Sequence, residues 1–385
     1  MTPAARTQAA IELLDAIIAA ARDDGPAADT LIARYFAQRR YAGSKDRRAV
    51  RELVYAAIRA HGERPTFGRA ALLTLAQADA SLHATFDGSP HGPAPIGEGE
   101  AAATPGLAPT WLLERLRASG LDEPELAALV ERAPLDVRVN RPADEDAVDL
   151  GEPIAGLPNA RRLPAGTDLA PYAGRIEVQD AGSQIVTLAA RAQPGQRVVD
   201  LCAGAGGKTL ALAAQMRNEG AILACDTDRG RLQRLPPRAG AAGVTIAETR
   251  LLNPGRELEA LSDWRAQADA VLIDAPCSGT GTWRRNPEAR WRLTPERLAR
   301  LVETQSRLLD IGAALVRPGG ALVFVVCSLL DAEGAEQAAA FAARSGWRVE
   351  TLALPAGRSR GLGVRLTPAS EATDGFFVAR FLAPC

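Results

Sequence analysis

Apolar side chains in the first 86 residues recur at helical spacing. Ile11, Leu14 and Ile18 fall on one face of a helix, and a second such face runs through residues 50–57. The stretch 87–109 contains five glycines and five prolines in 23 residues, which is too many for a regular element. We therefore expect a helical bundle followed by an exposed connection.

Beyond the connection, the period of the apolar positions changes. Two helices are predicted first, near residues 110–117 and 123–132, and alternation then predicts strands at 135–140 and 175–179, in a small α+β segment. From residue 197 on, short apolar runs alternate with helical stretches, and these runs are predicted strands: 198–201, 221–225, 244–246, 270–273 and 321–326. Such alternation is typical of an α/β fold with a parallel, doubly wound sheet.

The last two predicted strands differ from the others. Residues 347–354 and 376–382 have only an irregular loop between them, with no helix. A hairpin-like closing pair on a parallel sheet resembles the class I S-adenosylmethionine-dependent methyltransferase fold, which is Rossmann-like, more than a dinucleotide dehydrogenase.

Composition narrows the chemistry of the large C-terminal part. The chain has 385 residues and a formal net charge of −1, so any binding of nucleic acid must be local and not driven by an overall field. All three histidines precede residue 92, and the five cysteines form no C-x-x-C pair. These counts exclude Ser-His-Asp and Cys-His catalysis from that part and argue against a structural zinc site.

The length of the chain is typical of two or three domains. No apolar run approaches the ~18 residues of a membrane helix, and the first twenty residues lack the pattern of a secretory leader. We expect a cytoplasmic monomer that binds neither a membrane nor a metal.

A glycine-rich turn at residues 198–209 leads from a predicted strand into a helix. Glycines let the backbone approach a ligand, and the start of a helix offers free N–H groups. A phosphate-binding P-loop needs a glycine where Cys202 stands, and a dinucleotide fingerprint needs one where Thr209 stands. An adenosyl ligand without phosphates and a turn without a ligand remain as alternatives. The candidate ligand-binding residues are Cys202, Ala203, Gly204, Ala205, Gly206, Gly207 and Lys208.

Two acids at strand ends favour the adenosyl ligand. Asp226 lies 19 residues after Gly207, close to the ~20 residues at which a carboxylate meets ribose hydroxyls in doubly wound folds. Asp200, at the end of the preceding strand, would repel a pyrophosphate and stabilise a sulfonium cation. The pattern therefore predicts S-adenosylmethionine rather than ATP or NAD.

Two cysteines follow neighbouring predicted strands, Cys277 after the fourth and Cys327 after the fifth. Ligands bind beyond the carboxyl ends of such strands, so we expect both thiols in one cleft. Thiols opposite a methyl donor favour methylation of carbon 5 of a pyrimidine, since one thiolate adds to carbon 6 and the other thiol helps to release the product. Asp274 would then hydrogen-bond the base and stabilise the adduct.

The chain resembles the RNA (cytosine-5)-methyltransferases of the RsmB/Sun/Fmu family, which includes bacterial rRNA enzymes. The resemblance covers residues 175–385 and rests on five motifs: Gln179-Asp-Ala-Gly-Ser-Gln184, Asp200-Leu-Cys-Ala-Gly-Ala-Gly-Gly-Lys-Thr209, Asp274-Ala-Pro-Cys-Ser-Gly-Thr-Gly281, Val326-Cys-Ser328 and Asp374-Gly-Phe-Phe377. Three positions depart from the usual pattern: Ala205 replaces a proline, Val326 replaces a threonine, and Asn253 stands where the third strand commonly carries an acid.

The resemblance assigns roles to the site residues. It implies that Cys327 is the nucleophile, that Cys277 assists release, and that Asp274 contacts both the cytosine and the cofactor. It implies that the cofactor loop is 202–208, that Asp226 holds the ribose, and that Asn253 contacts the adenine side.

Arginines interleaved with tryptophans follow the motif at residues 274–281. Residues 281–300 carry a net charge of +4, with Trp283 and Trp291 among the arginines, a pattern suited to phosphate contacts and base stacking. We predict RNA contacts from Arg284, Arg285 and Arg290. The alternative is a solvated helix face with the tryptophans as packing anchors.

A second basic cluster, residues 34–59 with net charge +6, lies in the N-terminal helices. Residues 1–132 resemble the all-α NusB-like RNA-binding domain of the same family, and 133–178, with Arg138-Val-Asn-Arg141, resemble its small α+β RNA-recognition segment. The catalytic methyltransferase domain is then expected at 179–385.

These observations predict methylation of cytosine carbon 5 in RNA, with small-subunit rRNA as the substrate. A tRNA cytosine methyltransferase is the first alternative, because the motifs encode the reaction and not the RNA. A P-loop nucleotide hydrolase using Lys208, Thr209 and Asp274 is the second, and it leaves both cysteines unexplained. A non-catalytic RNA-binding relic is the third.

Overall fold

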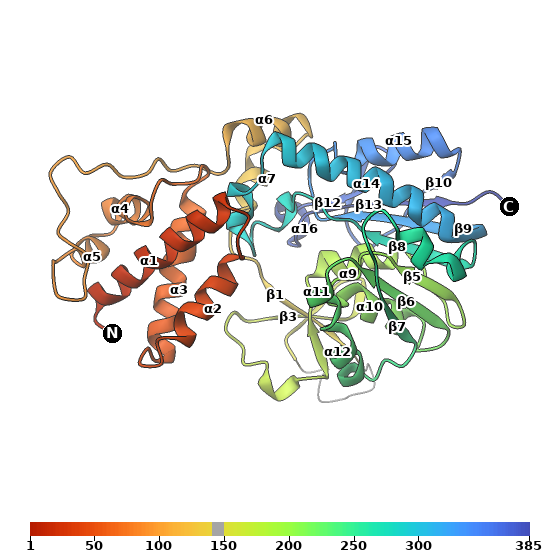
Figure 1. Ribbon diagram of the computed structural model, residues 1–385, viewed down its shortest axis with the longest axis horizontal. Helices are drawn as coiled ribbons and strands as arrows, with labels where there is room; N and C mark the ends of the chain where they lie inside the picture. The colour runs from red at the N-terminus through yellow and green to blue at the C-terminus, as the bar shows by residue number, and fades with distance from the viewer. Residues whose placement is uncertain (141–149) are drawn as a thin grey trace. The chain divides into compact units, whose positions relative to one another are not determined.

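The computed structural model describes residues 1–140 and 150–385, so Arg141 of the expected RNA-recognition segment lies outside the described residues. The chain divides into two compact units (Figure 1). The first comprises Met1–Arg132 and Thr282–Thr294, and the second comprises Ala133–Gly281 and Pro295–Cys385. The expected domain boundaries did not include this exchange, in which a short segment from the middle of the catalytic part joins the N-terminal helices.

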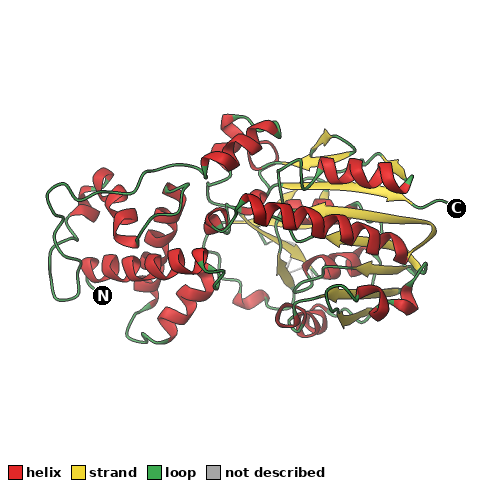
Figure 2. Ribbon diagram, turned by 45° about the horizontal axis from the view of Figure 1, so that its top comes forward, coloured by secondary structure: helices red, strands yellow, loops and turns green. Residues whose placement is uncertain are grey.

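The first unit is built of helices joined by loops (Figure 2). Its helices are α1 (Pro3–Arg22), α2 (Ala28–Ala37), α3 (Ser44–Ala60), α4 (Gly68–Ala78), α5 (Ala80–His83), α6 (Thr110–Ala118), α7 (Glu123–Ala128) and the 3-10 turn η4 (Pro287–Trp291). The predicted face of α1, with Ile11, Leu14 and Ile18, is buried against α3 and α4. Residues 87–109 form neither helix nor strand, as their glycines and prolines predict.

Arg290 is fully buried inside this first unit and is not an RNA contact. Its Nη2 donates hydrogen bonds to the carbonyl oxygens of Ile58 and His61, at 2.7 and 3.0 Å. These are carbonyls at the end of α3, where a helix leaves backbone acceptors unpaired and carries partial negative charge. The guanidinium therefore caps a helix, and the prediction that it binds phosphate is wrong.

The neighbours of Arg290 are packing residues too. Arg284 is buried and donates to the carbonyl of Arg132, at 3.3 Å, so its predicted role as an RNA contact is also wrong. Trp291 packs in the core of the helices and donates to the carbonyl of His61, at 2.9 Å, while Trp283 is fully buried. Neither ring is available for stacking on a base, which is the packing alternative that the sequence left open. Arg285 is half-buried and stays a predicted RNA contact.

The second unit contains a small antiparallel sheet and a large mixed one. The small sheet has the order β2-β3-β1-β4 and consists of β1 (Leu135–Val139), β2 (Glu152–Ile154), β3 (Leu157–Leu163) and β4 (Ile176–Val178), with the turn η1 (Ala170–Tyr172) before β4. β1 pairs antiparallel with both β3 and β4. The two strands predicted in this segment are β1 and β4.

The large sheet has the order β11-β12-β13-β9-β8-β5-β6-β7, and β10 pairs with β13. Its strands are β5 (Arg197–Asp200), β6 (Ala221–Asp226), β7 (Ala247–Leu251), β8 (Ala268–Asp274), β9 (Val316–Val326), β10 (Arg348–Glu350), β11 (Arg358–Arg360), β12 (Gly363–Leu366) and β13 (Phe376–Leu382). β5 to β9 are parallel, whereas β13 is antiparallel to β9 and to β10. This is the predicted parallel sheet with an antiparallel closing pair.

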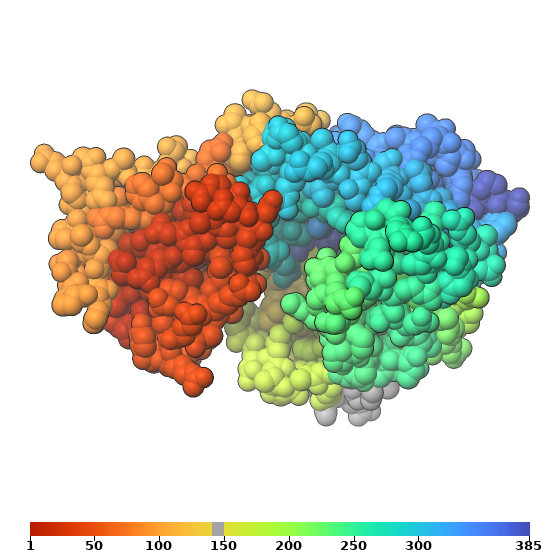
Figure 3. All heavy atoms as spheres, in the orientation of Figure 1, coloured from red at the N-terminus to blue at the C-terminus, as the bar shows by residue number. Residues whose placement is uncertain are grey.

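Helices cover both faces of this sheet. They are α9 (Ala181–Leu188), α10 (Gly207–Gln215), α11 (Arg229–Leu232), α12 (Leu235–Ala242), α13 (Glu257–Ala260), α14 (Pro295–Leu315), α15 (Ala335–Ser345) and α16 (Pro368–Glu371), with the 3-10 turns η2 (Ser262–Trp264) and η3 (Thr280–Thr282). α14 and α15 contact each other (Figure 1), and the cyan and blue atoms of their residues adjoin in the space-filling view (Figure 3). Along β9, Leu322 and Phe324 join the core under α14 and α15, while Val323 and Val325 join the core with α9 and α10. A strand buried on both faces reads as a continuous apolar run.

Two details of the large sheet differ from the sequence prediction. The third parallel strand is β7, at Ala247–Leu251. It begins directly after the residues 244–246 that the sequence predicted as a strand, so the predicted position was wrong by a few residues. The loop expected between the two last strands contains the hairpin β11–β12 and α16. The strand signal of β11 is weak because Arg358–Arg360 is a polar tripeptide between Gly357 and Gly361, and the strand is largely exposed. Among the described residues, no helix is both long and apolar enough to cross a membrane.

Candidate active site

Three loops meet at the carboxyl edge of the parallel strands, because β5, β8 and β9 are neighbours in the sheet. The loop after β8 carries Cys277 and the loop after β9 carries Cys327. Their sulfur atoms lie 3.3 Å apart, which is hydrogen-bond distance for a thiol. The structure thus brings together the two cysteines that the sequence singled out.

The contact between the two sulfurs lowers the acidity of Cys277. The sulfur contact with Cys327, together with burial, raises the pKa of the Cys277 thiol well above its ordinary value. Cys277 therefore keeps its proton at neutral pH, and either sulfur can donate the hydrogen bond. Of the remaining cysteines, Cys225 is buried in the core, where burial raises its pKa, and Cys385 is exposed at the chain end.

An ion pair stands beside the thiols. Lys208 Nζ lies 2.8 Å from Asp274 Oδ2, and the lysine is buried while the aspartate is about a third exposed. Burial lowers the pKa of Lys208, but the charge and hydrogen bond of Asp274 outweigh it and raise the pKa above its ordinary value. Lys208 thus stays charged and holds the Asp274 carboxylate, whose exposed part remains available to a substrate.

The glycine-rich turn closes against the second acid. Gly204 and Gly206 adopt φ angles of +56° and +90°, which favour glycine, and α10 begins at the next residue. The Gly204 N–H donates to Asp226 Oδ2 and the Asp228 N–H donates to Asp226 Oδ1, both at 2.7 Å. The loop and Asp226 therefore form one structure, with the start of α10 beside it.

Asp200 supplies a test of whether this loop fits a cationic adenosyl ligand. Its Oδ2 accepts a hydrogen bond from the Thr209 hydroxyl at 2.7 Å, while its Oδ1 is buried with no partner among the described residues. Burial raises the pKa of Asp200 to about 7. A buried carboxyl group with an unused oxygen fits a positively charged ligand and opposes a polyphosphate.

The other predicted cofactor residues also lie at this edge. The N–H of Ala203 donates to the Cys225 carbonyl at 2.7 Å, and the Ala205 carbonyl accepts a hydrogen bond from Arg238. Cys202 and Gly207 lie in the same turn. Asn253 is exposed after β7, and the preceding N–H, of Leu252, donates to the Asp226 carbonyl at 2.9 Å. The structure thus places all these predicted cofactor residues at one edge of the sheet.

Gly281 joins the loop of Cys277 to the loop of Cys327 and packs closely against Gly375. The Gly281 N–H donates to the Cys327 carbonyl at 3.0 Å, and the Gly281 carbonyl accepts from the Gly375 N–H at 2.8 Å. A Cβ atom on Gly281 would lie 2.1 Å from the Gly375 oxygen. Only glycine fits at this crossing, which explains one glycine of each motif.

Glu333 is a site residue that the sequence analysis missed. It is fully buried and accepts hydrogen bonds from Ser278 and Ser328, the residues that follow the two cysteines. The only signal in the sequence is an acid six residues after Cys327, in a run that is otherwise mostly apolar or small.

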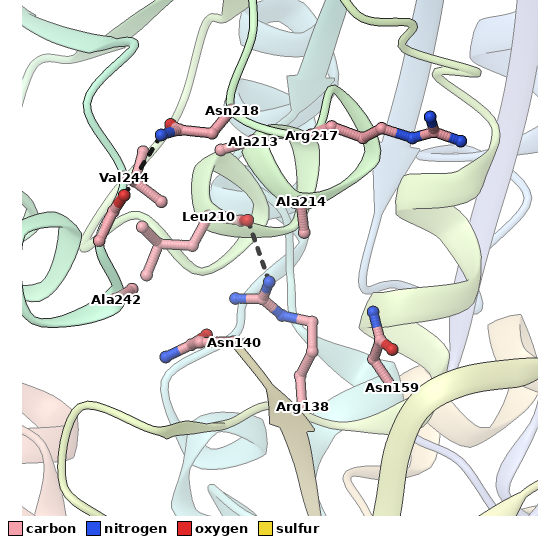
Figure 4. Close-up of a pocket in the computed structure, with 11 residues that line it drawn as sticks. Arg138, Asn140, Asn159, Leu210, Ala213, Ala214, Arg217, Asn218, Ala242 and Val244 are labelled. Atoms are coloured by element: carbon pink, nitrogen blue, oxygen red, sulfur yellow. Dashed lines mark hydrogen bonds between the residues drawn. The ribbon is translucent and has the colours of Figure 1, made fainter. Parts of the chain in front are cut away.

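A cavity of about 470 Å³ lies away from the cysteines, between β1 and α10 (Figure 4). Arg138 reaches into it from β1 and donates to the Leu210 carbonyl at 3.0 Å, and burial lowers its pKa to about 10. The chemistry of paired thiols and an ion pair locates an active site better than cavity size does, so we place the active site at the strand ends.

Comparison with known proteins identifies the family. A family model described as 16S rRNA methyltransferase RsmB/F matches residues 186–382, just over half of the chain. The chain belongs to the RsmB/F family. This membership confirms the resemblance drawn from the motifs, the class I methyltransferase fold, and S-adenosylmethionine as the family's cofactor.

Individual RsmB/F relatives agree. The probable ribosomal RNA small subunit methyltransferase B of Synechocystis sp. is 35% identical over 298 residues, covering 70% of this chain and 66% of the relative. The ribosomal RNA small subunit methyltransferase B of Xylella fastidiosa is 36% identical, covering 71% and 68%. Among solved structures, NSun6 from Pyrococcus horikoshii with SFG aligns at 26% identity with a TM-score of 0.51, covering 59% of this chain and 58% of that one. The match to the Synechocystis relative thus spans just under two thirds of that protein.

Proposed function

We propose that this chain methylates carbon 5 of a cytosine in RNA through a covalent adduct with Cys327. The observation that carries the proposal is the distance of 3.3 Å between the sulfurs of Cys277 and Cys327, beside the Lys208–Asp274 ion pair. S-adenosylmethionine, when bound, supplies an electrophilic methyl group to carbon 5.

Cys327 performs the attack. Its thiolate forms a bond to carbon 6 of the cytosine, and the electron pair of the carbon 5–carbon 6 double bond moves so that carbon 5 becomes nucleophilic. Asp274, held by Lys208, accepts a hydrogen bond from the polar edge of the base and fixes its orientation. No imidazole is required, and none is present after residue 91.

Cys277 serves the release. After methylation, carbon 5 must lose its proton, and the electrons of that C–H bond re-form the double bond as the sulfur of Cys327 leaves carbon 6. Cys277 lies 3.3 Å from the leaving sulfur, so its thiol can pass a proton to the departing Cys327 thiolate, and the Cys277 thiolate that remains accepts the proton from carbon 5. Its thiol hydrogen bond stabilises the departing thiolate.

The loop 202–208 and the acids at the strand ends hold the cofactor in this proposal. Asp226 accepts from the ribose hydroxyls, Asp200 faces the cationic part, and Asn253 lies on the adenine side. The similar NSun6 structure was solved with SFG, an analogue of S-adenosylmethionine, which supports S-adenosylmethionine as the cofactor.

RNA of the small ribosomal subunit is the substrate that we propose. The family description and the names of the two curated relatives support 16S rRNA over tRNA. Arg285 is the predicted contact that remains after Arg284 and Arg290 prove to be buried. The nucleotide-hydrolase alternative is disfavoured, because Thr209 donates its hydroxyl to Asp200 and Lys208 is paired with Asp274.

The test supplies the purified chain with methyl-labelled S-adenosylmethionine and separate pools of 16S rRNA, 23S rRNA, tRNA and DNA. Digestion of each pool to nucleosides then identifies the labelled product. We expect label in 5-methylcytidine from 16S rRNA alone. Label in tRNA would show that tRNA, and not 16S rRNA, is the substrate. Label in any nucleoside other than 5-methylcytidine would overturn the proposed reaction.

A further inference from the structure

A buried carboxylate lies behind the two cysteines and takes no part in the steps above. Glu333 stands in the loop between β9 and α15. Its Oε1 accepts from the N–H of Ser278 at 2.8 Å and from Nε2 of Gln305 at 3.0 Å. Its Oε2 accepts from the hydroxyls of Ser278 and Ser328, the second at 2.5 Å. Four donors fill the acceptor positions of one carboxylate, so Glu333 has none left for a substrate.

These donors connect the two cysteine loops. Ser278 follows Cys277 and Ser328 follows Cys327, and the two hydroxyl oxygens lie 3.1 Å apart. Gln305, from α14, adds a third support, since its Nε2 also donates to the Pro276 carbonyl at 2.9 Å. The loops cannot separate without leaving a buried carboxylate unpaired, which is strongly unfavourable.

We propose that Glu333 is a positioning residue that fixes Cys277 against Cys327 for the release step. Attack depends on Cys327 and the bound base, whereas release also needs the second thiol at a fixed distance from the first. Loss of the bridge therefore slows release more than attack. The claim about release rests on the proposed function, while the claim about the distance between the sulfurs does not.

The bridge acts through geometry and not through the charge of Glu333. In Glu333→Gln, the amide oxygen still accepts from Ser278 N–H and Gln305, and the two amide hydrogens point to the serine hydroxyls, which rotate to accept them. In Glu333→Ala, all four hydrogen bonds are lost. We expect the glutamine variant to retain most of the function that the alanine variant loses.

The first measurement needs neither RNA nor cofactor. Diamide oxidises two thiols to a disulfide and is itself reduced to the hydrazine, and a sulfur–sulfur distance of 3.3 Å requires a short movement to reach the ~2.05 Å of a disulfide. Peptide mapping follows the rate of Cys277–Cys327 closure, with Cys277→Ala as the blank. We expect closure to be slower by about tenfold in Glu333→Ala, as the effective concentration of one thiol near the other falls. Closure near the wild-type rate is expected in Glu333→Gln and in the exposed control Glu336→Ala.

The second measurement is turnover on the RNA that the wild type labels. We expect kcat to fall roughly 10- to 100-fold in Glu333→Ala while the KM for RNA changes by less than about twofold, with the protein–RNA adduct accumulating on denaturing gels. Should Glu333→Ala fail to fold by its melting curve, the double variant Ser278→Ala and Ser328→Ala removes the same hydroxyl contacts and retains the carboxylate.

Three results overturn the inference. One is unchanged disulfide closure in a folded Glu333→Ala variant, another is loss of kcat without adduct, and the third is equal damage by glutamine and alanine, which would show that the charge matters. If the wild type labels no RNA, the proposed function fails, and the diamide measurement still decides whether Glu333 holds the two thiols together.

Discussion

Two consecutive stretches of the chain, both predicted to serve the same site, differ in what they do. Residues 274–281 and 282–294 are both rich in polar side chains, and they follow one another without a break. In the first, Asp274 and Cys277 lie at the open end of a parallel sheet, next to a lysine and a second thiol. In the second, Arg290 and Trp291 donate to backbone carbonyls of the helical unit and are buried.

The difference shows which sequence signals carry information about function. A residue at the carboxyl end of a parallel strand is placed at the ligand edge by the topology itself. An arginine between tryptophans has no such constraint, because the same side chains bind RNA on a surface and cap helices in a core. Position in the fold, and not the polar character that both stretches share, decides which of them serves the site.

The largest effect expected is that of Cys327→Ala, which removes the proposed nucleophile. Methyl transfer to RNA should fall to background, because carbon 5 of an unactivated cytosine is a poor nucleophile. Binding of S-adenosylmethionine, measured by calorimetry, should stay unchanged and serves as the folding control. Activity above background would show that methyl transfer does not need Cys327, the thiol in the loop after β9.

Cys277→Ala should act differently from Cys327→Ala. We expect turnover to stop after the attack, so that a protein–RNA adduct survives denaturing electrophoresis. The double variant, which also lacks Cys327, should give no adduct and is the matched control. Absence of an adduct in the single variant would remove the release role from Cys277.

The fold of the second unit was largely predictable because its strands are buried on both faces. Continuous apolar runs mark β5, β6, β8 and β9, and the two acids and two cysteines stand at their ends. β11 escaped prediction because it is a short, largely exposed strand with no apolar run of its own.

Two parts of the site were not predictable for a different reason. The exchange of residues 282–294 into the helical unit depends on long-range contacts, such as that of Arg290 with the end of α3. The bridge by Glu333 depends on three segments that meet only in the folded chain, at Ser278, Gln305 and Ser328. A single acid in a loop gives no periodicity from which such a role can be inferred.

Arg290→Ala tests the structural side of the comparison. Its burial lowers the pKa of Arg290 to about 9, and its hydrogen bonds close the end of α3. We expect the free energy of unfolding to fall by about 2–4 kcal/mol, since several buried carbonyls lose a charged donor. Denaturant titration followed by tryptophan fluorescence measures it, because Trp291 packs in the same core.

The control for Arg290 is Arg48→Ala, at an exposed position of α3. It should change the unfolding free energy by less than about 0.5 kcal/mol. If Arg290→Ala were as stable as the wild type and instead weakened RNA binding, with a smaller dependence on salt, the arginine would be a phosphate contact after all.

The smallest effect concerns Asp200. The pH dependence of the affinity for S-adenosylmethionine shows whether this carboxyl group faces the ligand or serves only the packing of the fold. Burial, with the nearby charges of Asp274 and Asp226 acting against Thr209 and Lys208, raises the pKa of Asp200 to about 7. A bound cation favours the ionised carboxylate, so affinity for S-adenosylmethionine should rise with pH up to about 7 and then level off. At pH 6 about one tenth of the carboxyl is ionised, so affinity should be about tenfold weaker than at pH 8.

S-adenosylhomocysteine is the matched control, because it carries the same amino acid and nucleoside groups around an uncharged sulfur. Its affinity should change little between pH 6 and pH 8, and Asp200→Asn should remove the difference between the two ligands. Equal pH profiles for both ligands in the wild type would mean that the buried carboxyl does not face the sulfur. Asp200 would then belong with Arg290, as a polar group that the fold uses for its own packing, and the sulfonium would have to be stabilised elsewhere in the loop.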